Sequence, residues 1–176
     1  MNTMAFTKSA WEAAMYTHNS VRVDVGELHV SNDPGQTLLT YALGSCIGLA
    51  VHDAQRCVGG LAHIQLPDSP SDFSSRPEGV WAYADRAIPE LFQRLYAMKA
   101  NRRNLRIVLA GGASILDATH FFQIGRKNLL SVKRLLWREG YIVANEATGG
   151  DGWRTMRLDV GTGRVDIQTS KGRGTL

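Results

Sequence analysis

The chain has 176 residues, of which 44% are hydrophobic, a length and composition that suit one folded domain with a hydrophobic core. A formal net charge of +4 with 20% charged residues excludes a disordered or fibrous chain, and two cysteines are too few for a disulfide-stapled scaffold. Basic residues gather in the second half, but no run exceeds two and no aromatic–basic repeat accompanies them, so we expect no nucleic-acid partner.

In chain order, residues 1–20 predict a poorly structured arm without the apolar stretch of a signal peptide, so we expect a cytoplasmic protein with reduced thiols. Residues 34–52 carry no Asp, Glu, Lys or Arg. Their glycines and hydroxyl residues are not typical of the ~20 predominantly apolar residues of a membrane span. A pair of buried strands is the better interpretation, and we expect no membrane insertion.

Alternating or short apolar runs between turn residues predict eight strands. These are residues 21–25, 37–43, 46–52, 57–66, 105–110, 141–144, 153–160 and 164–168. Apolar residues at helical spacing predict a helix over residues 88–98, with Pro89 at its start or at a kink. A second helix over residues 129–136 ends before Gly140.

The remaining segments predict loops and a tail. Residues 67–79 hold three prolines and several serines, which is typical of a polar loop, and residues 170–176 predict a flexible basic tail. Because strands outnumber the helices and separate them, residues 21–169 predict one α+β or layered α/β domain of antiparallel or mixed strands.

The most informative feature is a predicted hairpin with its polar turn at residues 53–56. This register places Cys46 directly opposite His63 on one face, with Cβ atoms ~5 Å apart. A thiol and an imidazole at that separation can form the hydrogen bond of a base-activated sulfur nucleophile.

Other interpretations of this hairpin stay open at this point. A cysteine in an apolar strand is often a small core residue, with a hydrogen-bonded histidine beside it. A zinc site is a further alternative, because His52 and Cys57 pair in the same register. The two pairs lie about 20 Å apart along regular strands, which excludes one metal with all four ligands and argues against a Cys46–Cys57 disulfide.

A Cys–His pair normally has a third group that holds the imidazole tautomer. Thr40 is six residues before Cys46, about 20 Å away in an unbroken strand. It reaches His63 only if the chain folds back at Gly44–Ser45. Backbone N–H groups around this bend are the natural oxyanion donors, although the sequence does not assign them.

The segments 40–46, 59–63 and 66–67 resemble the CheD family of chemoreceptor glutamine deamidases. That family has a threonine, a cysteine six residues later and a histidine seventeen residues after the cysteine, which Thr40, Cys46 and His63 reproduce. Weaker matches continue through residues 21–169. They are Tyr83, Ala87–Pro89, Gly111–Ala113, Ile124–Gly125, Asn128, Gly149–Gly150 and Arg154.

The resemblance implies an α/β/β sandwich and a protein-glutamine deamidase that acts on methyl-accepting chemoreceptors without a cofactor or metal. It implies that Cys46 is the nucleophile, that His63 takes its proton and raises the thiolate fraction, and that Thr40 orients His63. It also suggests the CheC phosphatase as a partner. The alternatives are a non-catalytic adaptor that binds receptors or CheC, and a general cysteine peptidase or thioesterase. Basic side chains are expected to help receptor docking, namely Arg102, Arg103, Arg126 and Lys127.

Overall fold

A computed structural model describes residues 19–70, 79–114 and 123–176, so most of the predicted N-terminal arm and part of the predicted polar loop lie outside the described residues. The described strands form two five-stranded sheets. The outer sheet runs in the order β1 (Ser20–Arg22), β3 (Thr37–Leu43), β8 (Arg154–Asp159), β9 (Val165–Thr169) and β10 (Gly172–Thr175). The central sheet runs in the order β2 (Leu28–Ser31), β5 (Val58–Ile64), β4 (Ile47–Asp53), β6 (Leu105–Gly111) and β7 (Asn145–Thr148).

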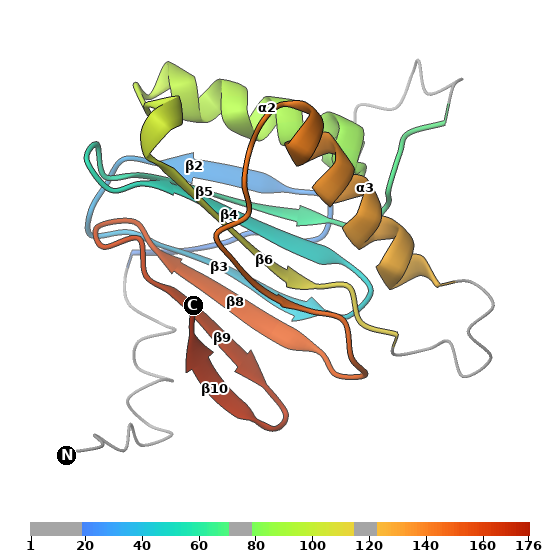
Figure 1. Cartoon of the computed structure of the whole chain (residues 1–176). Coiled ribbons are helices and arrows are strands. Elements are labelled where there is room, and N and C mark those ends of the chain that lie inside the picture. Colours follow the sequence, from blue (N-terminus) through green and yellow to red (C-terminus); the bar gives the residue numbers. More distant parts are fainter. Residues whose placement is uncertain (1–18, 71–78, 115–122) are drawn as a thin grey trace.

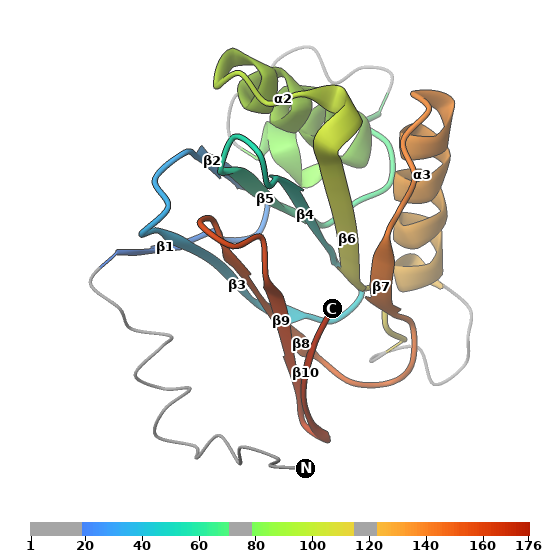
Figure 2. The ribbon, with the colours of Figure 1, turned by 60° about the vertical axis from the view of Figure 1, so that its left-hand side comes forward.

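Two α-helices, α2 (Ala84–Ala97) and α3 (Ile124–Arg138), cover one face of the central sheet, and the outer sheet covers its other face (Figures 1 and 2). Two short 3₁₀ helices, η1 (Val80–Ala82) and η2 (Arg102–Asn104), precede α2 and β6. Most strand neighbours are antiparallel, whereas β1–β3 and β6–β7 are parallel. This arrangement is the α/β/β sandwich expected from the sequence.

Each face of the central sheet has its own hydrophobic core. Leu49 and Ala62 pack in the core beneath the helices, whereas their neighbours Ala50 and Leu61 pack in the core between the two sheets. Every residue of β4 and β5 is buried, because both faces of these strands are covered. This burial accounts for the charge-free stretch in the sequence, which forms strands as predicted.

The predicted register of the β4–β5 hairpin is wrong by two residues. Gly48, not Cys46, pairs with His63, and the chain turns after Asp53, which still pairs with Val58. The Asp53 side chain explains the shift, since its Oδ1 accepts the N–H groups of Gln55 and Arg56 in the turn at 3.0 and 3.2 Å. A side chain that holds the turn in this way belongs to the last residue of the strand.

Other differences lie at the edges of the sheets. Residues 141–144 do not form the predicted strand, and strand β7 begins only at Asn145. The Tyr141 ring instead stacks on Phe92 of α2, with ring centroids 4.1 Å apart. The sequence did not predict β2. Residues 172–175 of the predicted flexible tail instead pair with β9 as strand β10.

The helices extend further than their apolar spacing indicates. Pro89 lies inside α2, which begins five residues earlier at Ala84 rather than at the proline. As the sixth residue of α2, Pro89 lies beyond the first turn and forgoes the hydrogen bond that its N–H would donate to the Asp85 carbonyl. The buried face of α2 is the predicted one, with Ile88 and Leu95 in the core beneath the helices.

Candidate active site

His63 lies in the middle of the fold, on β5, with its side chain between the two sheets and only 2% exposed. Its Nδ1 is 2.8 Å from Thr40 Oγ1 on β3 of the opposite sheet. The contact forms because the chain folds back between β3 and β4, the bend that Thr40 needs in order to reach His63. Two of the three predicted site residues therefore meet directly.

A third group fixes the direction of this hydrogen bond. The Thr40 hydroxyl donates to the Val23 carbonyl at 2.8 Å. A hydroxyl has one proton, so Thr40 Oγ1 must accept the Nδ1–H of His63. His63 then carries its lone pair on Nε2, the form in which an imidazole acts as a base. The sequence offered no signal for Val23, since any residue can supply a backbone carbonyl.

Cys46 lies in the three-residue connection between β3 and β4, and its half-buried side chain packs against the core between the sheets. The Gly112 N–H donates to the Cys46 carbonyl at 2.9 Å, and the Ala113 N–H donates to the Gly44 carbonyl at 2.8 Å. Gly111 has φ +104°, and a Cβ on it would lie 2.0 Å from the Cys46 oxygen. Only glycine allows this approach, which gives a physical reason for the Gly111–Ala113 motif.

Cys46 and His63 share the space between the sheets without being directly opposed. Cys46 is two residues from Gly48, the partner of His63. In a regular ladder this diagonal offset places side chains about 7–8 Å apart, rather than the ~5 Å expected from the sequence. The buried Nε2 of His63 has no hydrogen-bond partner among the described residues, so no hydrogen bond joins it to the thiol.

Burial sets the protonation of both groups. Desolvation lowers the pKa of His63 to about 4, against the opposing influence of the Asp24 charge. Desolvation also raises the pKa of Cys46, although its own backbone N–H favours the thiolate. The raised pKa of Cys46 runs against the raised thiolate fraction that the family resemblance implies. Burial thus favours the neutral thiol and the neutral imidazole.

The alternative zinc site required His52 to pair with Cys57, but His52 pairs with Gly59. His52 Nε2 lies 2.8 Å from the Val160 carbonyl, and Cys57 lies in the hairpin turn with φ +49°. Across residues 19–70, 79–114 and 123–176, no cluster of three or more His, Cys, Asp or Glu side chains could hold a metal ion.

A family model described as CheD chemotactic sensory transduction matches residues 65–169, more than half of the chain. The chain belongs to the CheD family. It is 41% identical over 152 residues to the probable chemoreceptor glutamine deamidase CheD 1 of Syntrophus aciditrophicus, covering 86% of this chain and 95% of that protein. It is 43% identical over 146 residues to the corresponding protein of Solibacter usitatus, covering 83% and 86%. The Clostridium novyi protein of the same name is 39% identical over 154 residues, covering 86% and 93%.

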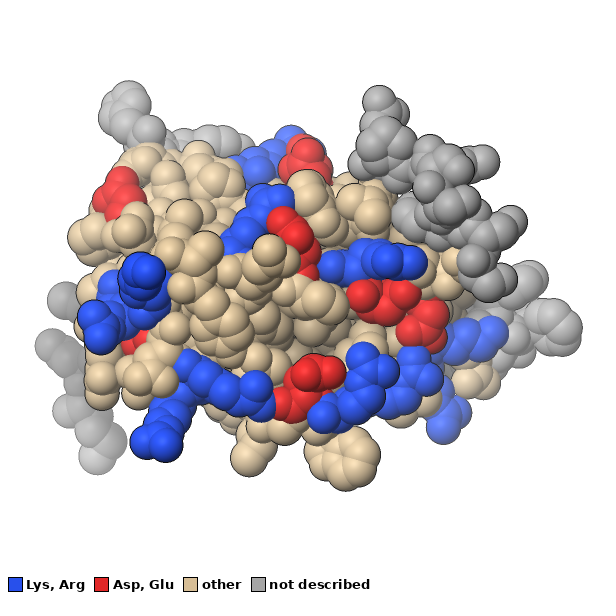
Figure 3. Space-filling view, turned by 90° about the horizontal axis from the view of Figure 1, so that it is seen from above, with Lys and Arg blue, Asp and Glu red and all other residues tan. Residues whose placement is uncertain are grey.

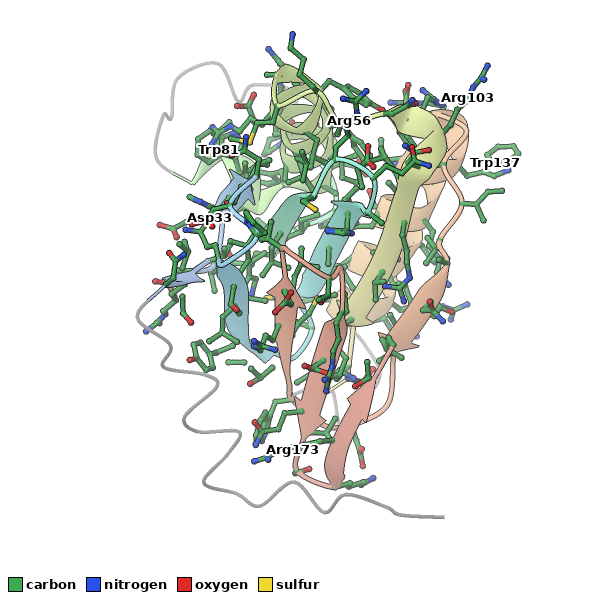
Figure 4. All side chains as sticks on the ribbon, turned by 90° about the vertical axis from the view of Figure 1, so that its left-hand side faces the viewer. Asp33, Arg56, Trp81, Arg103, Trp137 and Arg173 are labelled. Carbon is green, nitrogen blue, oxygen red and sulfur yellow. The ribbon has the colours of Figure 1, made fainter. Side chains whose placement is uncertain are left out.

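The basic residues of this CheD chain do not form one patch. Arg102 stacks over the Tyr141 ring at 4.4 Å and contacts the Glu139 carbonyl beyond the end of α3, whereas Arg126 and Lys127 lie in its first turn. The 15 residues of α3 separate the two pairs by roughly 20 Å. Figure 3 looks onto the helical face, where Lys and Arg lie among Asp and Glu, and Figure 4 shows Arg103 and Trp137 projecting outward.

The described part of the CheD chain contains no helix that is both long and apolar enough to cross a membrane. The charge-free residues 34–52 instead contain strand β3 of the outer sheet and most of strand β4 of the central sheet. The only stretch that raised the question of a membrane span is thus accounted for by sheet burial.

Proposed function

We propose that this chain is a protein-glutamine deamidase that converts glutamine side chains of methyl-accepting chemoreceptors to glutamate and releases ammonia. Its relatives are named for this activity. The observation that carries the proposal is the geometry around His63, whose Nδ1–H is held by Thr40. Its buried Nε2, which has no hydrogen-bond partner in the described part of the chain, faces the same inter-sheet space as the Cys46 side chain.

The reaction follows from these roles. His63 Nε2 takes the Cys46 proton, and the sulfur attacks the γ-amide carbon, so that the carbonyl electron pair moves onto oxygen. When this tetrahedral intermediate collapses, the C–N bond breaks and His63 returns the proton to the departing ammonia, which leaves a γ-glutamyl thioester. A water molecule that loses a proton to His63 then attacks the thioester, which releases glutamate and restores the thiol. Thr40 orients His63 throughout.

The test is incubation of the purified chain with the cytoplasmic fragment of a chemoreceptor, followed by peptide mass spectrometry and an ammonia assay. We expect specific glutamines to become glutamates with one ammonia released for each. Saturable receptor binding without conversion or ammonia would contradict the proposal and favour the adaptor function. Cleavage of the receptor backbone would favour a peptidase.

We further propose that the chain acts in the cytoplasm and binds the phosphatase CheC. The substrate region of a chemoreceptor is cytoplasmic, and the family resemblance implies CheC as a partner. A CheC phosphatase should co-elute with this chain in size-exclusion chromatography. Separate elution at concentrations that saturate receptor binding would remove CheC from the proposal without affecting the deamidase activity.

A further inference from the structure

Every carbonyl group of the Gly44–Cys46 connection is held by a donor from another part of the chain. The Gly44 and Cys46 carbonyls accept the N–H groups of Ala113 and Gly112. The Ser45 carbonyl between them accepts Asn128 Nδ2 of α3 at 2.9 Å. Three successive carbonyls fixed in this way define the orientation of the peptide planes that carry the nucleophile.

The N–H groups of the same connection are less fully used, since only the Gly44 N–H donates to a backbone carbonyl, that of Ala42 at 2.8 Å, among the described residues. Among the residues that the structure describes, the N–H groups of Ser45 and Cys46 donate to no backbone carbonyl. The Cys46 N–H instead favours the thiolate of its own side chain, against the desolvation that raises the pKa of this thiol. Because a trans peptide directs its C=O and N–H to opposite sides, a Ser45 carbonyl that faces α3 turns the Cys46 N–H away from the helix.

Asn128 is built into this position. Its side chain is fully buried, and Nδ2 donates to Gln65 O at 2.8 Å as well as to Ser45 O, so it links the Cys46 connection to the segment two residues beyond His63. Gly125, one turn earlier, lets α3 approach closely, since a Cβ there would lie 2.5 Å from the Ala113 oxygen.

The two carbonyl acceptors also fix the orientation of the Asn128 amide. Its buried Oδ1 consequently has no hydrogen-bond partner within the described part of the chain. A buried acceptor without a partner is unfavourable, and such groups in folded proteins call for an explanation. Correct placement of the nucleophile's peptide plane supplies one.

We infer that Asn128 is a positioning residue that holds the Ser45–Cys46 peptide so that the Cys46 N–H stabilises the oxyanion formed when the sulfur attacks an acyl carbon. This inference deepens the proposed function, because it assigns an oxyanion donor to the same site. A preorganised N–H aimed at developing charge is worth about 10²–10³ in rate.

Two reactions of Cys46 separate this role from a merely structural one. With 4-nitrophenyl acetate, the thiolate attacks the ester carbonyl, the electron pair moves onto oxygen, and collapse expels 4-nitrophenolate and leaves an acetyl thioester. With iodoacetamide, the thiolate displaces iodide directly and no oxyanion forms. Both rates should be measured for the wild-type chain, for Asn128→Ala and for a matched control, each in a Cys57→Ala background so that only Cys46 reacts.

Ser131→Ala is the matched control. Ser131 is buried on the same helix one turn after Asn128, and its hydroxyl contacts the Pro67 carbonyl at 3.2 Å instead of the Cys46 connection. We expect Asn128→Ala to slow acetylation by about 10²-fold and to leave alkylation close to the wild-type rate. Ser131→Ala should leave both rates close to wild type.

Unchanged acetylation in Asn128→Ala, or an equal loss of both reactions, would overturn the inference. If Asn128→Ala does not fold, the same ratio is measured on Asn128→Asp, which keeps the shape of the side chain but loses the Nδ2 donor. Because neither reagent involves a chemoreceptor, the result is separate from the proposed function. A chain that shows the expected ratio but does not deamidate receptors would refute the deamidase function and retain the oxyanion site.

Discussion

His63 is the sixth of the seven residues of strand β5, whereas Cys46 lies in the irregular connection between β3 and β4. The ladder with β4 holds the backbone of the histidine on one side, and hydrogen bonds with the Gly26 and Glu27 backbone hold it on the other. Its side chain needs only Thr40 and the Val23 carbonyl. The cysteine connection depends on donors that come from 66 or more positions later in the sequence. The base is thus positioned by regular structure, and the nucleophile by long-range contacts.

Because of this difference, different substitutions should disturb the histidine half and the cysteine half of the site. A change near His63 alters the electronic state of the imidazole while the sheet persists. A change in the Gly111–Ala113 turn or in α3 displaces Cys46, although these segments carry no reacting group. The following predictions test the contrast between the two halves.

The largest expected effect is the loss of deamidation in Cys46→Ala. The reaction has no other nucleophile in this account, so kcat should fall by at least about 10⁴-fold, the size of effect seen when a nucleophile is removed from a catalytic set. Cys57→Ala removes the other free thiol and should retain activity. Receptor deamidation followed by peptide mass spectrometry makes the measurement, and a fully active Cys46→Ala would remove Cys46 from the mechanism.

Gly111→Ala should destabilise the cysteine half of the site without touching a reacting group. A new Cβ would lie 2.0 Å from the Cys46 oxygen at a residue with φ +104°. Backbone strain and overpacking together should cost about 4 kcal/mol in the free energy of unfolding. Urea denaturation measures this loss.

Gly79→Ala is the control for that substitution. Gly79 also has positive φ, +73°, but a Cβ there would meet no atom of the described residues within 4 Å. It should lose only the ~1 kcal/mol of the left-handed backbone conformation. Equal losses in the two variants would show that the close approach to Cys46 does not matter.

The buried imidazole of His63 should make the free energy of unfolding depend on pH. The pKa of His63 is lowered to about 4 from an ordinary value of 6.5 by burial. Above pH 6.5 neither the folded nor the unfolded chain binds this proton, and between pH 6.5 and 4 only the unfolded chain binds it. Stability is therefore lost as the pH falls through this window, by about 3 kcal/mol.

His63→Gln isolates this contribution, because the other titratable groups are common to both chains. The wild-type chain should lose more unfolding free energy than His63→Gln between neutral pH and pH 4. Urea denaturation at a series of pH values gives both curves. Parallel curves would show that His63 binds its proton equally well when folded.

The smallest expected effect concerns the tautomer of His63. Thr40→Val removes the acceptor of Nδ1–H, and kcat should fall by about 10–10²-fold, a part of what a correctly placed base contributes. Thr40→Ser retains the hydroxyl and should retain most of the activity. Thr37→Val, on the same strand, loses a contact with Arg157 instead and should leave kcat unchanged. A fully active Thr40→Val would remove Thr40 from the mechanism.

The layered fold could be predicted from strand periodicity, and the Thr40–His63 contact from the resemblance of these residues to the CheD family, since spacing alone left Thr40 about 20 Å away in an unbroken strand. The register of the hairpin could not, since it depends on hydrogen bonds of the Asp53 side chain within the turn. The support of Cys46 by Gly111–Ala113 and Asn128 was equally out of reach. Those residues matched the family motif, but only the three-dimensional packing of α3 against the β3–β4 connection reveals what they hold.

The most direct test of the central claim uses hydroxylamine to intercept the thioester during receptor deamidation. A γ-glutamyl thioester on Cys46 reacts with hydroxylamine to give a γ-glutamyl hydroxamate on the receptor and the free thiol. We expect the wild-type chain to produce hydroxamate at the same glutamines that it otherwise converts to glutamate, and Cys46→Ala to produce neither product. Conversion to glutamate with no hydroxamate at saturating hydroxylamine would contradict the account, because water would then attack the amide without an acyl-enzyme on Cys46.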